Sequence, residues 1–223
     1  MTPRTLLATA RVPGGAELRL YRRNADFIIA LDRNELMSSR MSGSEEALAR
    51  LTAARLLGVR APRVLIGGYG MGFTLRAALA AFGAQARITV AELVPEIIDW
   101  ARGPMAELTT GCLDDPRVEL ALADVADPIA AGAGRCDAIL LDVDNGPDGL
   151  VRAENDRLYS AAGLAAAKRA LAPGGVLAIW SAAPDPAFTR RLARAGFAVE
   201  EALVRARSNG KGPRHVIWLA TPR

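Results

Sequence analysis

The chain has 223 residues, of which 51% are hydrophobic and 23% are charged, and its formal net charge is +4. This length fits one large domain, or one domain with a small appendage, with enough apolar side chains for a full core. We find neither a secretory signal nor an apolar run long enough to span a membrane, so we expect a cytoplasmic protein without a membrane partner. Two cysteines and a single histidine argue against a disulfide framework and a zinc site, and we expect no metal.

The excess of basic residues is spread along the chain. Nearly all of these residues are arginine, and only Lys168 and Lys211 are lysine. The aromatic side chains that stack on bases in nucleic-acid interfaces are not interleaved with them. We therefore expect a small-molecule partner and no nucleic acid.

The first part of the chain predicts short antiparallel strands. Apolar and polar residues alternate in three stretches separated by turn residues, and these stretches span 5–12, 17–23 and 26–32. We therefore predict a small β-strand segment over residues 1–41 and one larger domain over 42–223. The larger domain is predicted to begin with a helix, because Ser42 and Glu45 have the spacing of a capping box and an apolar stripe follows them.

From residue 63 onward, strands alternate with helices. Seven apolar strands are predicted over 64–68, 86–93, 117–123, 136–143, 175–182, 197–204 and 214–220. Helices are predicted over 74–82, 95–110, 157–171 and 185–195. This order is typical of an α/β fold with a doubly wound, Rossmann-like sheet. No helix separates the last two strands, so we expect an antiparallel hairpin at the sheet edge, as in class I S-adenosylmethionine (AdoMet) transferases.

The first strand of this series runs into a glycine-rich turn, GYGMG, over residues 68–72. A dinucleotide site would require a small residue at the next position, where this chain has Phe73. AdoMet has no pyrophosphate and needs only bare backbone against its ribose and its amino-acid part. We therefore predict that Gly68, Gly70 and Gly72 bind an AdoMet-like cofactor, with a plain tight turn as the alternative.

Acidic residues follow the next two strands. Glu92, with Leu93 beside it, ends the second strand and can accept hydrogen bonds from both ribose hydroxyls. Asp124 follows the third strand and can accept the amino group of an adenine, with Val125 as an apolar contact. Open α/β sheets bind ligands beyond the carboxyl ends of their strands, so these four residues are predicted to bind the cofactor. A solvated glutamate and a helix N-cap are the alternatives.

The fourth strand ends at Asp142, and Asp144 follows two residues later. Carboxylates beside a sulfonium can hold a cationic acceptor, take up its proton, or do both. We predict that Asp142 and Asp144 are catalytic and that Asp142 also contacts the cofactor, with turn chemistry as the alternative for the residues that follow. The candidates for binding a small-molecule acceptor are Tyr69, Met71 and Tyr159, together with Asp144 and with Glu45 and Glu46 of the N-terminal segment.

From about Asp26 to the C-terminus, the chain resembles the spermidine synthase (polyamine aminopropyltransferase) family. The matching stretches, in the family's order and spacing, are VLIGGYGMGFTLRAAL, VAELVPEIIDWA, DDPRVELALADV, CDAILLDVDNGP, LYSAAGLAAAKRALAPGGVLAIWSA and HVIWLA. The resemblance implies that Glu92 binds ribose, that Asp124 and Val125 bind adenine, and that Asp142 is the essential catalytic aspartate. It also implies a homodimer.

The chain departs from the family pattern at residues that bind amines. Met71 stands where the family has an aspartate that helps hold the aminopropyl donor, and Asn145 stands where it has a second acid. The family's amine-binding tyrosine falls on Gly163-Leu164, and the Tyr-His/Gln-Glu of its gate segment becomes Glu45-Glu46-Ala47.

These departures lead to a prediction about the reaction. A buried diamine needs several carboxylate partners, so the loss of acids indicates that the polyamine site is not retained. Met71 suits intact AdoMet, whose own carboxylate an acid at that place would repel. We therefore predict methyl transfer from AdoMet to a small molecule. Aminopropyl transfer from decarboxylated AdoMet at a remodelled amine site is one alternative, and a catalytically silent AdoMet-binding module is another.

Overall fold

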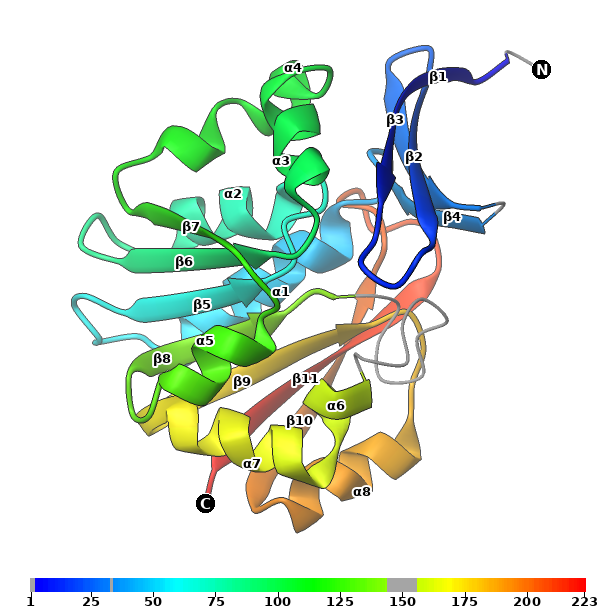
Figure 1. The fold of residues 1–223 in the computed structure, drawn as a ribbon. Coiled ribbons are helices and arrows are strands. Elements are labelled where there is room, and N and C mark those ends of the chain that lie inside the picture. The colour runs from blue at the N-terminus through cyan, green and yellow to red at the C-terminus, as the bar shows by residue number, and fades with distance from the viewer. Residues whose placement is uncertain (1–2, 33, 144–155) are drawn as a thin grey trace.

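The computed structural model describes residues 3–32, 34–143 and 156–223, which form two β-sheets (Figure 1). The smaller sheet is antiparallel, and its strands in spatial order are β1 (Thr5–Arg11), β2 (Glu17–Arg23), β3 (Asp26–Leu31) and β4 (Asn34–Ser38). The first three strands agree with the prediction from the sequence. β4 was not predicted, because it is short and a bulge in its pairing with β3 interrupts the alternation of apolar residues.

The larger sheet has seven strands in the order β10-β11-β9-β8-β5-β6-β7. Their bounds are β5 (Arg63–Gly67), β6 (Arg87–Glu92), β7 (Val118–Leu122), β8 (Cys136–Leu141), β9 (Leu171–Ser181), β10 (Phe197–Arg205) and β11 (Arg214–Pro222). β5 to β9 pair in parallel, whereas β11 pairs antiparallel with both β9 and β10. The predicted doubly wound sheet and its C-terminal antiparallel hairpin are therefore confirmed.

Helices cover both faces of the larger sheet (Figure 1). One face packs against α1 (Gly43–Arg55), α2 (Phe73–Ala81) and α3 (Pro95–Arg102), and the other packs against α5 (Ala126–Ala131), α7 (Ala161–Ala170) and α8 (Pro186–Arg194). Along β5, Val64 and Ile66 belong to the first core and Leu65 to the second. Burial on both faces explains why this strand is a continuous apolar run in the sequence.

Two predicted helices are each divided in the structure. The prediction over 95–110 corresponds to α3 and α4 (Ala106–Thr109), because Pro104 cannot continue the hydrogen-bond pattern of α3. The prediction over 157–171 corresponds to α6 (Asp156–Tyr159) and α7, which begins after Ser160. The Ser160 hydroxyl accepts the Gly163 N–H at 3.1 Å and so caps α7. A short 3₁₀ helix, η1 (Cys112–Asp114), follows α4.

The predicted capping box at the start of α1 does not form. The Ser42 side chain makes no capping hydrogen bond, and the Glu45 carboxylate accepts instead from the Ser44 hydroxyl at 2.6 Å. The helix start is anchored by the Gly43 N–H, which donates to the Ala206 carbonyl in the connection between β10 and β11 at 2.9 Å. The Glu45 side chain is turned away from the helix end and lines a pocket.

The small sheet ends at Ser38 and the first strand of the larger sheet begins at Arg63. The division of the chain into residues 1–41 and 42–223 stays a prediction, because the two sheets share one hydrophobic core. Among the helices of the described ranges, none is long and apolar enough to cross a membrane.

Candidate active site

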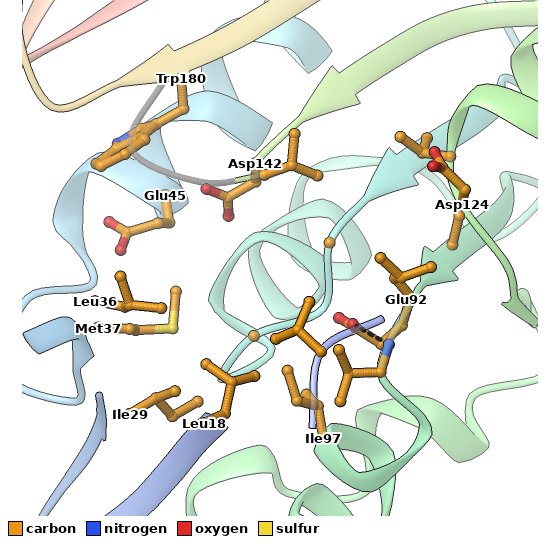
Figure 2. Close-up of a pocket in the computed structure, with 18 of the residues that line it drawn as sticks. Leu18, Ile29, Leu36, Met37, Glu45, Glu92, Ile97, Asp124, Asp142 and Trp180 are labelled. Atoms are coloured by element: carbon orange, nitrogen blue, oxygen red, sulfur yellow. Dashed lines mark hydrogen bonds between the residues drawn. The ribbon is translucent and has the colours of Figure 1, made fainter. Parts of the chain in front are cut away.

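A pocket lies where the carboxyl ends of β5, β6 and β8 face the small sheet (Figure 2). The strand order reverses between β5 and β8, and open α/β sheets bind ligands at such a point. Figure 2 shows Glu45 and Trp180 at one end of the pocket, Glu92 and Asp124 at the other, and Asp142 between them. The wall from the small sheet and its β1–β2 connection is apolar and consists of Val12, Leu18, Ile29, Leu36 and Met37.

The glycine turn between β5 and α2 forms the floor of this pocket. Gly68 and Gly70 line it and have positive φ angles of 86° and 55°, which favour glycine. A Cβ at Gly68 would lie 2.5 Å from the Asp142 carbonyl oxygen, and one at Gly70 would lie 2.9 Å from Met37 Cε. Gly72 also has a positive φ, but it packs against the Tyr69 ring and is not among the lining residues.

Glu92 holds the backbone of two loops together at the pocket. One carboxylate oxygen accepts the Tyr69 N–H and the other accepts the Val94 N–H, both at 2.9 Å. The side chain is only 6% exposed, and this burial raises its pKa while the hydrogen bonds oppose the rise. The backbone N–H groups of Gly70 and Leu93 also favour the ionised carboxylate. Leu93 lies beside it in the pocket wall.

Asp124 and Val125 also line the pocket. Asp124 Oδ1 accepts the Ala126 N–H at 2.9 Å at the start of α5, so the alternative helix-capping contact is present as well. Asp124 Oδ2 forms an ion pair with Arg157 at 3.2 Å. The structure therefore brings Asp124 and Val125 to the same pocket as Glu92 and the glycine turn.

Asp142 and Glu45 form a pair of carboxylates, with Asp142 near the middle of the pocket and Glu45 toward its Trp180 end. Asp142 follows β8 and accepts a 2.6 Å hydrogen bond from the Thr74 hydroxyl. Glu45 comes from α1, is 5% exposed, and accepts from Ser44. Burial raises the pKa of Asp142 to about 6. Burial and the nearby charge of Asp142 raise the pKa of Glu45 to about 8, so one proton is held at this pair near neutral pH.

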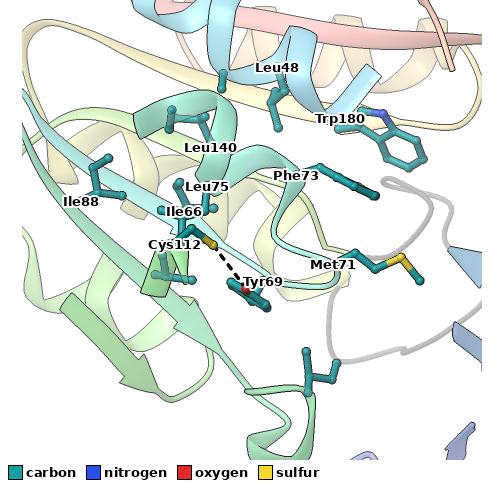
Figure 3. Packing of buried hydrophobic residues seen from close by; sticks show 14 of the residues in the cluster. Leu48, Ile66, Tyr69, Met71, Phe73, Leu75, Ile88, Cys112, Leu140 and Trp180 are labelled. Carbon is teal, nitrogen blue, oxygen red and sulfur yellow. Dashed lines mark hydrogen bonds between the residues drawn. The ribbon is translucent and has the colours of Figure 1, made fainter. Parts of the chain in front are cut away.

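Three of the residues predicted to bind the acceptor, Tyr69, Met71 and Tyr159, are not among the lining residues. Figure 3 shows Tyr69 and Met71 among the buried side chains of the core. Met71 belongs to the glycine turn, and its side chain is fully buried in the core. The Tyr69 hydroxyl lies 3.4 Å from Cys112 Sγ, and burial raises the pKa of this phenol. Tyr159 packs edge-on against Phe188 and donates to the Val143 carbonyl at 3.4 Å. The predicted catalytic residue Asp144 lies outside the described residues.

Two residues that line the pocket were given little or no role in the prediction from the sequence. Glu45 was only a minor candidate, and Trp180 was not a candidate at all, although both line the pocket. The sequence does contain a signal for Glu45, because this glutamate lies in the segment that aligns with the gate segment of the family. Trp180 ends an apolar strand, where a tryptophan is expected to be core.

Several known proteins are similar to this chain in sequence or in fold. No family model matches the chain. Over 124 residues, it is 35% identical to the polyamine aminopropyltransferases of Mycobacterium tuberculosis and Mycobacterium bovis. The match covers 54% of this chain and only 23% of each relative, so the chain spans less than a quarter of their length in the aligned region.

Solved structures match almost the whole chain. A spermidine synthase from Thermotoga maritima has a TM-score of 0.76 at 20% identity, over 98% of this chain and 73% of that one. A spermidine synthase in complex with the transition-state analogue AdoDATO has a TM-score of 0.75 at 20% identity, over 98% and 72%. A probable spermidine synthase from Corynebacterium glutamicum has a TM-score of 0.66 at 14% identity, over 99% and 81%.

The strand order, the C-terminal hairpin and these neighbours define a class I methyltransferase-like fold. Within this class, the predicted resemblance to the spermidine synthase (polyamine aminopropyltransferase) family is confirmed. The curated relatives are named polyamine aminopropyltransferases, and the solved structures are described as spermidine synthases.

Proposed function

We propose that the chain transfers an aminopropyl group from decarboxylated AdoMet to an amine. The observation that carries this proposal is the pair of carboxylates, Glu45 and Asp142, in a pocket whose other walls are largely apolar. A cation loses its hydration when it enters such a pocket, and carboxylate partners offset this loss. The prediction of methyl transfer depended on the acidic residues that are missing from the family's amine-binding positions. Glu45 of α1 supplies a carboxylate to the pocket and so replaces one of them.

The position of Met71 also weakens the argument for intact AdoMet. That argument required Met71 to face the donor, and its side chain is fully buried in the core instead. The acids near the donor are then Glu45 and Asp142, which would repel the carboxylate of AdoMet and attract the free amine of its decarboxylated form. The charge of the pocket therefore favours the decarboxylated donor.

The other end of the pocket suits the adenosyl part of this donor. Gly68 and Gly70 expose bare backbone, the Glu92 carboxylate lies in the pocket lining for the ribose hydroxyls, and Asp124 has a carboxylate for the adenine amino group. Val94, Ile97 and Val125 supply apolar surface for the base. These roles are part of the proposal.

Amine alkylation requires the removal of a proton. An amine acceptor is an ammonium near neutral pH, and its nitrogen has no lone pair until it is deprotonated. When bound, the sulfonium donor supplies an activated carbon and methylthioadenosine as the leaving group. We assign Asp142 as the general base and Glu45 as its partner, because an acid with a pKa of about 6 is largely ionised at pH 7.

Calorimetry tests the donor. We expect decarboxylated AdoMet to bind at least about tenfold more tightly than AdoMet, a difference of about 1.4 kcal/mol. Glu45→Gln should reduce this preference, because glutamine cannot take up the negative charge that Glu45 gains when an ammonium binds beside it. Glu46→Gln is the matched control, since Glu46 pairs with Arg50 and is not among the lining residues, and it should keep the preference.

Turnover tests the reaction. Decarboxylated AdoMet and 1,4-diaminobutane should release methylthioadenosine in the presence of the chain. Tighter binding of AdoMet, with S-adenosylhomocysteine as the product, would mean methyl transfer instead. Binding of either donor without any product from a panel of amines would favour the silent module.

A further inference from the structure

A chain of hydrogen bonds leads from Glu45 away from the pocket. The Ser44 hydroxyl lies 2.6 Å from Glu45 Oε2 and 2.9 Å from His215 Nδ1. Ser44 is fully buried, and His215 is partly exposed at the start of β11. The His215 ring also packs edge-on against Trp180, with ring centroids 4.9 Å apart, which fixes its orientation.

The Ser44 hydroxyl can conduct a proton because it both donates and accepts. When Glu45 is ionised, Ser44 donates to the carboxylate and accepts from Nδ1–H of His215. When Glu45 is protonated, its O–H donates to Ser44, and Ser44 donates to a bare Nδ1. The two arrangements interconvert when one proton moves along each hydrogen bond and Nε2 of the ring exchanges a proton with solvent, without any movement of heavy atoms.

We infer that Ser44 and His215 conduct the proton of the acceptor from Glu45 toward solvent; this inference rests on the proposed function. In the reaction, the ammonium loses one proton to the carboxylate pair, the amine nitrogen forms a bond to the aminopropyl carbon, and the carbon–sulfur bond breaks. The electrons of that bond stay on sulfur in methylthioadenosine. Glu45 then passes its proton to Ser44, Ser44 passes its own to Nδ1, and the imidazolium releases the Nε2 proton. Ser44 and His215 are thus positioning residues.

Two acidic residues act on Glu45, at the pocket end of this series of hydrogen bonds. Asp142 at the end of β8 and Glu46 on α1 both favour the protonated form of Glu45. His215 is paired with Val204 of β10 and packs against Trp180 of β9, neither of which carries a charge. Burial lowers the pKa of His215, so the ring is neutral near pH 7 and can accept a proton.

Nitrogen NMR of the ¹⁵N-labelled protein tests the path directly. The chain has one histidine, so its ring signals belong to His215 and only Nδ1 and Nε2 have to be distinguished. While the ring is neutral, we expect Nδ1 to be bare below the pKa of Glu45, about 8, and to carry the proton above it. Addition of methylthioadenosine and 1,4-diaminobutane at pH 7 should also move the proton to Nδ1, because a bound ammonium ionises Glu45.

Two variants should abolish this change of tautomer between pH 7 and pH 9. Glu45→Gln removes the titrating group, and Ser44→Ala removes the hydroxyl that links it to the ring. Glu46→Gln should keep the change at a slightly lower pH. A change that persists in Glu45→Gln or Ser44→Ala, or that is absent from the unmodified chain, would overturn the inference.

Turnover separates this inference from the proposed function. His215→Gln should lower kcat about tenfold, less than the roughly 10²- to 10⁴-fold contribution of a direct general base, and should leave methylthioadenosine affinity within about twofold. An active wild-type chain with an unaffected His215→Gln variant would contradict the path alone. A wild-type chain without aminopropyl transfer would contradict the proposed function, and the NMR result would still decide whether Glu45 and His215 exchange a proton.

Discussion

Thr74 affects the charge of Asp142 through one hydrogen bond. Its hydroxyl donates to the carboxylate at 2.6 Å, which lowers the pKa of Asp142 and opposes the effect of burial. In Thr74→Val the pKa should therefore rise, and less of the ionised base should be present in acid solution. A hydrogen bond to a charged group contributes about 1.5–3 kcal/mol, so we expect kcat/KM at pH 6 to fall about tenfold.

A pH profile of kcat/KM distinguishes this effect from damage to the fold. The rising limb should move to higher pH in Thr74→Val, and activity should recover in part in alkaline solution. Thr74→Ser keeps the hydroxyl and should retain the wild-type profile. A uniform loss at every pH would show that Thr74 does not act through the charge of Asp142.

Single residues of the site were predictable where the fold brings strand ends together. Glu92, Asp124 and Asp142 follow three parallel strands, and the carboxyl ends of such strands meet at one edge of a sheet. Glu45 was predictable only as one of several candidates, and the burial of Met71 was not predictable, because their surroundings depend on how α1 and α2 pack. A comparison of motifs shows that an acid is missing at Met71. It does not show that Glu45 of α1, from an earlier part of the chain, supplies another acid to the pocket.

At the scale of elements, α1 is held against the β10–β11 connection by a close contact at Gly43. A Cβ at this position would lie 2.4 Å from the backbone carbon of Arg207. Gly43→Ala should therefore move the start of α1, which carries Ser44 and Glu45. We expect a loss of about 1–3 kcal/mol in the free energy of unfolding, typical of overpacking, measured by urea denaturation.

Gly83→Ala is the matched control for this substitution. No atom lies within 4 Å of a Cβ at Gly83, so the change should have little effect on stability. Gly43→Ala should also weaken the preference for decarboxylated AdoMet, because it displaces Glu45. Unchanged stability and unchanged preference would mean that the helix start tolerates the extra methyl group.

The type and order of most elements could be predicted because the larger sheet is buried on both faces and its strands are long apolar runs. The short elements β4 and α5 were missed, since they contain too few residues to show a period. The capping box was predicted from spacing alone. It does not form because the Glu45 side chain lines the pocket, where its carboxylate accepts a hydrogen bond from the Ser44 hydroxyl.

At the scale of the whole molecule, the pocket is bounded by both sheets. Apolar side chains of the small sheet, such as Leu18 and Ile29, face residues at the strand ends of the larger one. Methylthioadenosine should therefore slow hydrogen exchange in residues 34–38 as well as in the turn over 67–73. Exchange measured by mass spectrometry checks this, and protection confined to the larger sheet would contradict a shared site.

The position of Trp180 gives the protein a built-in optical reporter. The chain has three tryptophans, all of them buried in the cores, and among them only Trp180 also lines the pocket. Its indole N–H has no hydrogen-bond partner among the described residues. Occupancy of the pocket therefore changes the surroundings of one emitting side chain out of three, so binding can be followed by intrinsic fluorescence without any label.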